Sequence, residues 1–152
     1  MVSQQGDPAP AVSAPNQHGE TVSPDFEEPT VLYFYPKDDT PGCTTEAAQF
    51  VAERDSYEDA GVAVYGVSTD SVESHRAFAD DQDVWFDLLA DPDGDVAEAF
   101  DLDLRRGVAP RTTFVLVDGE VERVYEDVDP DGHPREVLMD LLEGGLVELD
   151  EA

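Results

Sequence analysis

The residues with the clearest chemical potential lie around Cys43, the only cysteine in the chain. Residues 36–46 read PKDDTPGCTTE, so a proline-glycine pair comes directly before the cysteine, and apolar residues recur at helical spacing after it. This pattern predicts that Cys43 lies in the first turn of a helix. Unpaired peptide N–H groups and the helix dipole stabilise a thiolate there and lower its pKa, whereas a free thiol with a pKa of about 8.5 is largely protonated near neutral pH. The sequence therefore favours a nucleophilic thiol.

Other residues in this stretch suit such a thiol. Thr40, one turn upstream, can offer its hydroxyl to the sulfur or to an oxygen atom of a substrate. Pro36 and Pro41 stiffen the loop, because each fixes its own φ and restricts the residue before it. Each feature also has an ordinary explanation on its own: a lone cysteine is more often an inert apolar residue, threonine is common in turns, and Glu46 suits the first turn of a helix.

The elements predicted around this stretch alternate between strands and helices. Residues 31–35 (VLYFY) form a continuous β-branched and aromatic run, which is typical of a central strand buried on both faces. The other predicted elements are, in chain order, a helix over 43–61, a strand over 62–67, a helix over 71–80, a short strand over 86–89, a short helix over 96–100, a hairpin over 112–125 with a type I′ turn at Asp118-Gly119, and a helix over 134–142. This order predicts an α/β fold, a three-layer sandwich with a central mixed β-sheet flanked by helices.

The chain is predicted to form a single domain over residues 1–152. Its length of 152 residues and hydrophobic content of 40% are enough to bury a core. Residues 1–30 hold five prolines among glycine, serine and acidic residues, which predicts an extended N-terminal segment with a short hairpin around 17–20. The residues after Gly145 are predicted to form an acidic tail.

The charge balance restricts the partners. With 8 basic and 37 acidic residues the formal net charge is -29, which repels nucleic acid and anionic membrane surfaces, so neither partner is expected. Lys37 is the only lysine, and arginine supplies the other seven basic positions. Such a surface is typical of halophilic proteins, because molar salt screens the repulsion between carboxylates. The alternative is an unusually acidic protein from an ordinary cytoplasm.

The sequence also predicts the cellular location and whether a metal is bound. The first thirty residues contain no basic residue and no continuous apolar run, so no signal peptide is expected and a cytoplasmic location is predicted. His18, His75 and His133 have no ligand spacing and are interpreted as surface or structural residues. Residues 127–132 begin like a calcium loop, but Leu138 stands where the bidentate glutamate is needed. We therefore expect no metal and no cofactor.

The motif Pro36-x-x-x-Thr40-x-x-Cys43 resembles the active-site signature of the peroxiredoxins. The longer run at 33–46, together with GVSTD at 66–70, LLAD at 88–91 and RTTFVLV at 111–117, is similar to the bacterioferritin comigratory protein, or Q-type, branch of that family. This resemblance covers most of the chain. It implies a thioredoxin-like fold and a peroxidase that reduces hydrogen peroxide and organic hydroperoxides in antioxidant defence.

The resemblance also implies a role for each matching residue. Cys43 would be the peroxidatic nucleophile, and Pro36 would shield it from solvent and from a second oxidation. Thr40 would hydrogen-bond the sulfur and the peroxide. Arg111 would hold the thiolate and polarise the O–O bond, and Glu46 would orient Arg111. The other candidate arginines, disfavoured because no Thr-x-Phe strand follows them, are Arg105, Arg106 and Arg123.

One position departs from the resemblance. Many members of this branch carry a second cysteine five residues after the first, where this chain has Ala48. An internal disulfide is impossible, so the sulfenic acid would be reduced by an external thiol: a thioredoxin-like or glutaredoxin-like protein, a small thiol, or a second subunit. A monomer or weak dimer is expected. The alternative function is a non-catalytic redox sensor on the same fold that passes oxidation to a partner protein.

Overall fold

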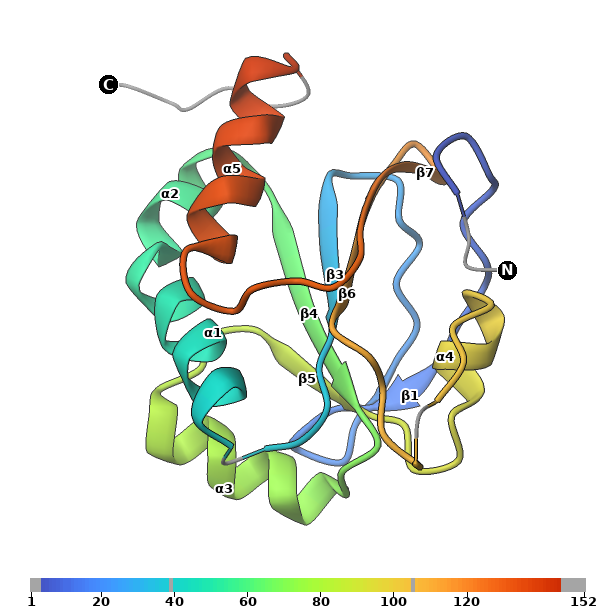
Figure 1. Cartoon of the computed structure of the whole chain (residues 1–152), viewed down its shortest axis with the longest axis vertical. Helices are drawn as coiled ribbons and strands as arrows, with labels where there is room; N and C mark the ends of the chain where they lie inside the picture. The colour runs from blue at the N-terminus through green and yellow to red at the C-terminus, as the bar shows by residue number, and fades with distance from the viewer. Residues whose placement is uncertain (1–3, 39, 105, 146–152) are drawn as a thin grey trace.

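The computed structural model describes residues 4–38, 40–104 and 106–145. Its main sheet has five strands in the order β5-β4-β3-β6-β7 (Figure 1). These strands are β3 (Thr30–Phe34), β4 (Ala63–Ser68), β5 (Asp87–Ala90), β6 (Thr112–Val117) and β7 (Glu120–Tyr125). β3 pairs in parallel with β4 and antiparallel with β6, so the sheet is mixed. The run at 31–35 therefore does supply the central strand, and every residue of β3 is buried.

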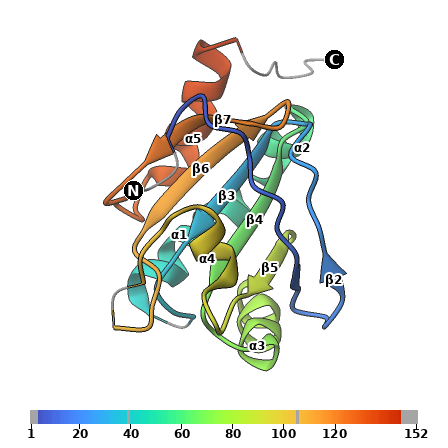
Figure 2. The same cartoon turned by 90° about the vertical axis from the view of Figure 1, so that its right-hand side faces the viewer.

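Helices and the N-terminal segment cover the two faces of this sheet (Figures 1 and 2). One face carries α1 (Pro41–Ala52), α2 (Arg54–Asp59), α3 (Val72–Gln82) and α5 (His133–Glu143), and the other carries α4 (Asp95–Ala99). Val31 and Tyr33 point into the first core and Leu32 and Phe34 into the second, as the alternation of side chains along a strand requires. The predicted three-layer α/β sandwich is confirmed.

The structure agrees with the predicted β6–β7 turn and differs from one predicted helix. Asp118 and Gly119 both have positive φ, 53° and 73°, as a type I′ turn between β6 and β7 needs. The predicted helix over 43–61 instead begins at Pro41 and breaks at Glu53, where φ is -94° and ψ is 11°. Neither glycine nor proline occupies this position, so the sequence carries no signal for the break.

The N-terminal segment packs against the sheet as well as leading into it. β1 (Ala14–Pro15) and β2 (Thr21–Val22) form the short hairpin that was expected. Val12, Ala14 and Phe26 are buried in the core on the α4 side. The Gln17 side chain accepts a hydrogen bond from the Leu88 peptide N–H at 2.9 Å and donates one to the Phe86 carbonyl at 3.0 Å. The segment therefore covers part of the exposed edge of β5.

The predicted acidic tail, residues 146–152, lies outside the described residues. Within the described ranges, no helix combines the length and the apolar character that crossing a membrane requires.

Candidate active site

Cys43 lies where the chain passes from the central strand into α1. It is the third residue of the helix and its side chain is 2% exposed. Pro41 begins the helix, a position where its missing N–H is not needed and its fixed φ is already suitable. The predicted location of the cysteine in the first turn, where peptide N–H groups lack helical partners, is therefore confirmed.

Arg111 reaches the Cys43 sulfur from just before the strand that pairs with the central strand β3. It immediately precedes β6, the antiparallel neighbour of β3, and its Nη2 donates a hydrogen bond to the Cys43 sulfur at 3.4 Å. The peptide N–H of Val128 donates to the Arg111 carbonyl at 3.2 Å and ties its backbone to the loop after β7. Arg111 is thus the arginine that meets the sulfur, while the rival Arg105 lies outside the described residues.

Gly42 makes the approach of this arginine possible. A β-carbon at residue 42 would lie 2.5 Å from Arg111 Nη2 and 3.2 Å from Arg111 Cζ, closer than van der Waals contact allows. The guanidinium therefore occupies the space that a side chain would fill. In the sequence, Gly42 stands out only as half of the proline-glycine pair before Cys43, although a glycine directly before a reactive cysteine can equally indicate close approach of another group.

Glu46 lies one turn after Cys43 on the same helix. Its side chain is 1% exposed, and its Oε1 is 3.5 Å from Arg111 Nη1. Neither of these two buried atoms makes a hydrogen bond within the described part of the chain. Burial raises the pKa of Glu46 to about 8, although the positive charge of Arg111 opposes the shift. The carboxyl group is therefore mainly protonated near neutral pH, so its contact with Arg111 is weaker than that of a full ion pair.

Thr40 and Pro36 complete the predicted set. Thr40 precedes α1, and its carbonyl accepts a hydrogen bond from the Thr44 peptide N–H at 2.9 Å. Its hydroxyl donates to the Lys37 carbonyl at 2.8 Å, so the proton expected to face the sulfur points elsewhere. Pro36 lines a cavity of about 420 Å³ that it shares with Arg111. The rest of the cavity is lined by Val108, Ala109, Pro110, Asp127 and Val128.

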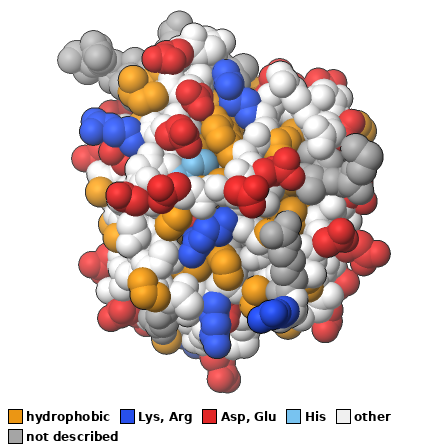
Figure 3. Space-filling view, in the orientation of Figure 1, with side chains coloured by type: hydrophobic (Ala, Val, Ile, Leu, Met, Phe, Trp, Pro, Cys, Tyr) orange, Lys and Arg blue, Asp and Glu red, His pale blue; other side chains and the backbone are white. Residues whose placement is uncertain are grey.

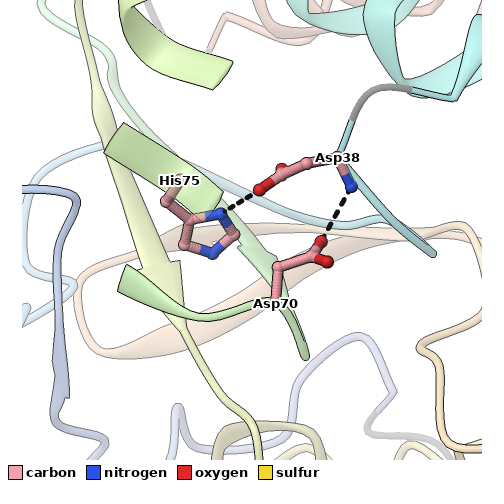
Figure 4. A group of neighbouring side chains, drawn as sticks. All are labelled: Asp38, Asp70 and His75. Carbon is pink, nitrogen blue, oxygen red and sulfur yellow. Dashed lines mark hydrogen bonds and ion pairs between the residues drawn. The ribbon is translucent and has the colours of Figure 1, made fainter. Parts of the chain in front are cut away.

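A second polar group includes Asp38 of the same loop. Asp38, Asp70 and His75 place one potential ligand atom each within 4.8 Å of one another (Figure 4). His75 is fully buried and His133 is 2% exposed, which agrees with a structural interpretation of both residues. His18 is exposed.

These features define a class of protein: an α/β sandwich that holds one thiol at a helix N-terminus beside an arginine is built for thiol redox chemistry. A profile of the AhpC/TSA family matches residues 5–124. The chain therefore belongs to the AhpC/TSA family. It is 36% identical over 151 residues to peroxiredoxin Bcp of Bacillus subtilis, covering 93% of this chain and 96% of the relative. It is 38% identical over 143 residues to peroxiredoxin Bcp of Escherichia coli K12, covering 88% and 92%.

Solved structures agree with this assignment. Peroxidoxin BcpB of Mycobacterium tuberculosis superposes with a TM-score of 0.85 at 31% identity, covering 93% of this chain and 97% of that one. The bacterioferritin comigratory protein of Xanthomonas campestris gives 0.82 at 34% identity, covering 88% and 91%. The thioredoxin-like fold is therefore confirmed. Structures of Xanthomonas campestris peroxiredoxin Q with serine at either of two cysteines also match, whereas this chain has a single cysteine.

Proposed function

We propose that this protein is a thiol-dependent peroxidase that reduces hydrogen peroxide and organic hydroperoxides through Cys43. The thiolate attacks the terminal oxygen of the hydroperoxide, the O–O bond breaks, and the released oxygen takes up a proton and leaves as water or an alcohol. Cys43 becomes a sulfenic acid, so the sulfur is oxidised by two electrons and the peroxide is reduced by two.

The contact between Arg111 and the Cys43 sulfur carries this proposal. Negative charge moves from the sulfur to the leaving oxygen during the attack. The guanidinium is already in contact with the sulfur, and Cys43 lies in the first helical turn, so this charge is stabilised without rearrangement. Glu46 contacts Arg111 and supports its position, and Pro36 lines the cavity beside Arg111.

The apolar side of the cavity supports organic substrates. Proline, valine and alanine side chains line it next to Arg111, so an alkyl group can lie there beside the guanidinium that contacts the sulfur. The bacterioferritin comigratory protein of Xanthomonas campestris has alkyl peroxide reduction activity, which favours the same substrate class here.

An external thiol must complete the cycle. It attacks the sulfenic acid and releases water, forming a mixed disulfide with Cys43. A second thiol then attacks this disulfide, restores the Cys43 thiol and leaves as an oxidised dimer of the reductant. Because the chain has one cysteine, both thiols come from outside it. A thioredoxin-like or glutaredoxin-like protein or a small thiol fits this role.

A monomer or a weak dimer fits the surface. The net charge of -29 makes copies of the chain repel one another, and among the described residues Met139, 46% exposed, is the one large hydrophobic side chain that is well exposed. Light scattering at high and low salt tests this expectation.

The decisive experiment is intact mass spectrometry after one equivalent of peroxide, with a sulfenic-acid trap, on the unmodified protein and on Cys43→Ser. We expect an adduct on the unmodified protein alone. Arg111→Ala should slow oxidation by about 10²-fold, while Arg106→Ala and Arg123→Ala serve as matched controls with unchanged rates. Absence of the adduct would refute the proposal.

Turnover then separates a peroxidase from a redox sensor. With dithiothreitol present, a peroxidase consumes many equivalents of peroxide. A sensor would be oxidised rapidly once and would then wait for its partner protein.

A further inference from the structure

His75 is a fully buried histidine that faces the catalytic loop. It lies on α3, and its Nδ1 is 2.7 Å from Oδ2 of Asp38 (Figure 4). Its Nε2 is 3.0 Å from the Leu89 carbonyl oxygen at the end of β5. Both ring nitrogens therefore have protein partners, and the imidazole connects α3, the edge strand and the loop before α1.

The hydrogen-bond partners determine where the protons are. A carbonyl oxygen only accepts, so Nε2 must carry a proton. The Asp38 carboxylate already accepts from the Tyr35 hydroxyl at 2.7 Å and from the Ser74 hydroxyl at 2.8 Å. Burial raises the pKa of Asp38, but these bonds together with that from His75 outweigh it, and the pKa lies below its usual value. One proton lies between Nδ1 and Oδ2, so the ring bonds at both nitrogens and links the carboxyl group of Asp38 to the Leu89 carbonyl.

The same hydrogen bonds argue against a metal at this cluster. Oδ2 of Asp70, the third potential ligand, accepts from the Asp38 peptide N–H at 2.8 Å and from the Ser68 hydroxyl at 2.7 Å. The atoms that would face a cation thus already share protons with one another or with the protein. The group is a hydrogen-bond network that holds Asp38 by both its side chain and its backbone.

Asp38 lies in the short loop that positions the active site. Pro36 precedes it and Thr40 follows it, and Thr40 leads directly into the helix that carries Cys43. The Thr40 hydroxyl is itself bonded to the carbonyl of Lys37, next to Asp38. Movement of Asp38 would therefore displace the start of α1 and change how the sulfur meets Arg111.

We propose that His75 is a positioning residue for the peroxidase reaction: through hydrogen bonds at both ring nitrogens it anchors Asp38, and through Asp38 it fixes the loop that presents Cys43 to Arg111. This inference rests on the proposed peroxidase function. His75 does not touch the reacting atoms, so it acts only through geometry, where a displacement of about 1 Å can slow a reaction 10²-fold.

Two substitutions separate this role from general packing. The amide nitrogen of an asparagine can take the place of Nδ1 and keep the bond to Asp38, whereas that of a glutamine takes the place of Nε2 and keeps only the bond to Leu89. We expect His75→Asn to retain the rate of Cys43 oxidation by hydrogen peroxide within about threefold. We expect His75→Gln to lower it about tenfold or more, at similar thermal stability.

The outcomes have separate meanings. If the unmodified protein does not react with peroxide, the peroxidase function itself fails. If it reacts and both variants match it, or both slow equally in proportion to lost stability, the positioning role is refuted. Because a variant can fail to fold, nitrogen NMR of the His75 ring in the unmodified protein at about pH 7 provides a second test. A hydrogen bond at each ring nitrogen supports the proposal, and a ring nitrogen without one overturns it.

Discussion

At the scale of single residues, the chemistry depends on how closely the guanidinium of Arg111 approaches Cys43. The sulfur and Nη2 are 3.4 Å apart, and the missing side chain of Gly42 leaves the space that makes this distance possible. Four of the five predicted site residues lie at the contact between Arg111 and Cys43 or beside Arg111, namely Cys43, Arg111, Glu46 and Pro36. Thr40 is different, because its hydroxyl bonds to a carbonyl three residues back, a local choice that no spacing rule determines.

Gly42→Ala tests the close approach. The added methyl group would push the flexible end of Arg111 away from the sulfur, so we expect Cys43 oxidation by peroxide to slow at least about tenfold. Stability should not fall, since alanine is the better helix former. Stopped-flow oxidation and thermal unfolding measure the two effects, with Ala48→Ser on the exposed side of the same helix as the control. An unchanged rate would mean that the contact is not needed.

Glu46 predicts a pH dependence of stability. Its pKa is raised by burial from the ordinary 4.5 to about 8 in the folded protein. Between these values the folded state keeps a proton that the unfolded state has lost, so the free energy of unfolding falls as pH rises through this range, by at most about 1.4 kcal/mol per pH unit. Above about pH 8 the contribution is fully lost.

Glu46→Gln should remove this component, because the amide does not titrate. Urea unfolding of both proteins at several pH values measures the difference. The variant should gain stability relative to the unmodified protein as pH rises from about 5 to about 8. Glu73→Gln, on the exposed side of α3, is the control. Parallel curves for Glu46→Gln and the unmodified protein would show that the buried carboxyl is ionised in the folded state throughout.

At the scale of elements, the sequence predicted the strands best, because buried strands depend on apolar runs that are visible locally. The central strand and the β6–β7 turn are examples. The role of α3 could not be predicted in this way. Its helical pattern is clear, but the proposed role of His75 depends on hydrogen bonds to Asp38 and the Leu89 carbonyl, which are 37 and 14 residues away in sequence. Only the parallel pairing of β3, β4 and β5 brings these groups together.

The start of α3 offers a test of how this helix supports the site. The Ser71 hydroxyl accepts a hydrogen bond from the Ser74 peptide N–H at 3.1 Å, so it caps the helix. Ser71→Ala should lower the free energy of unfolding by about 1 kcal/mol. It should also slow peroxide oxidation slightly, because Ser74 in the loosened turn bonds to Asp38.

Ser71→Asp is the matched control for the cap. An aspartate caps as well as serine and interacts favourably with the helix dipole, so this variant should keep both stability and rate. Chemical unfolding and stopped-flow oxidation measure the pair. Equal losses in both variants would show that the position matters for a reason other than its cap.

At the scale of the whole molecule, the surface is dominated by carboxylates. Figure 3 shows acidic side chains spread over the visible face with fewer basic ones among them. Ion pairs such as Arg54–Glu58 and Arg135–Glu53 involve only a small part of the 37 acidic residues. Folding therefore brings like charges together at a cost in free energy, which the buried aromatic and aliphatic cores on both faces of the sheet must exceed.

This charge predicts that salt stabilises the protein. Screening shortens the Debye length from about 10 Å at 0.1 M to about 3 Å at 1 M, so repulsion between surface carboxylates weakens most over the first part of that range. We expect the unfolding midpoint in potassium chloride to rise steeply at low concentration and then level off. Sucrose stabilises by exclusion from the protein surface and does not screen charge, so its effect should lack this initial steep rise. Matching curves for the two additives would contradict electrostatic stabilisation and the interpretation of this surface as an adaptation to a salt-rich cytoplasm.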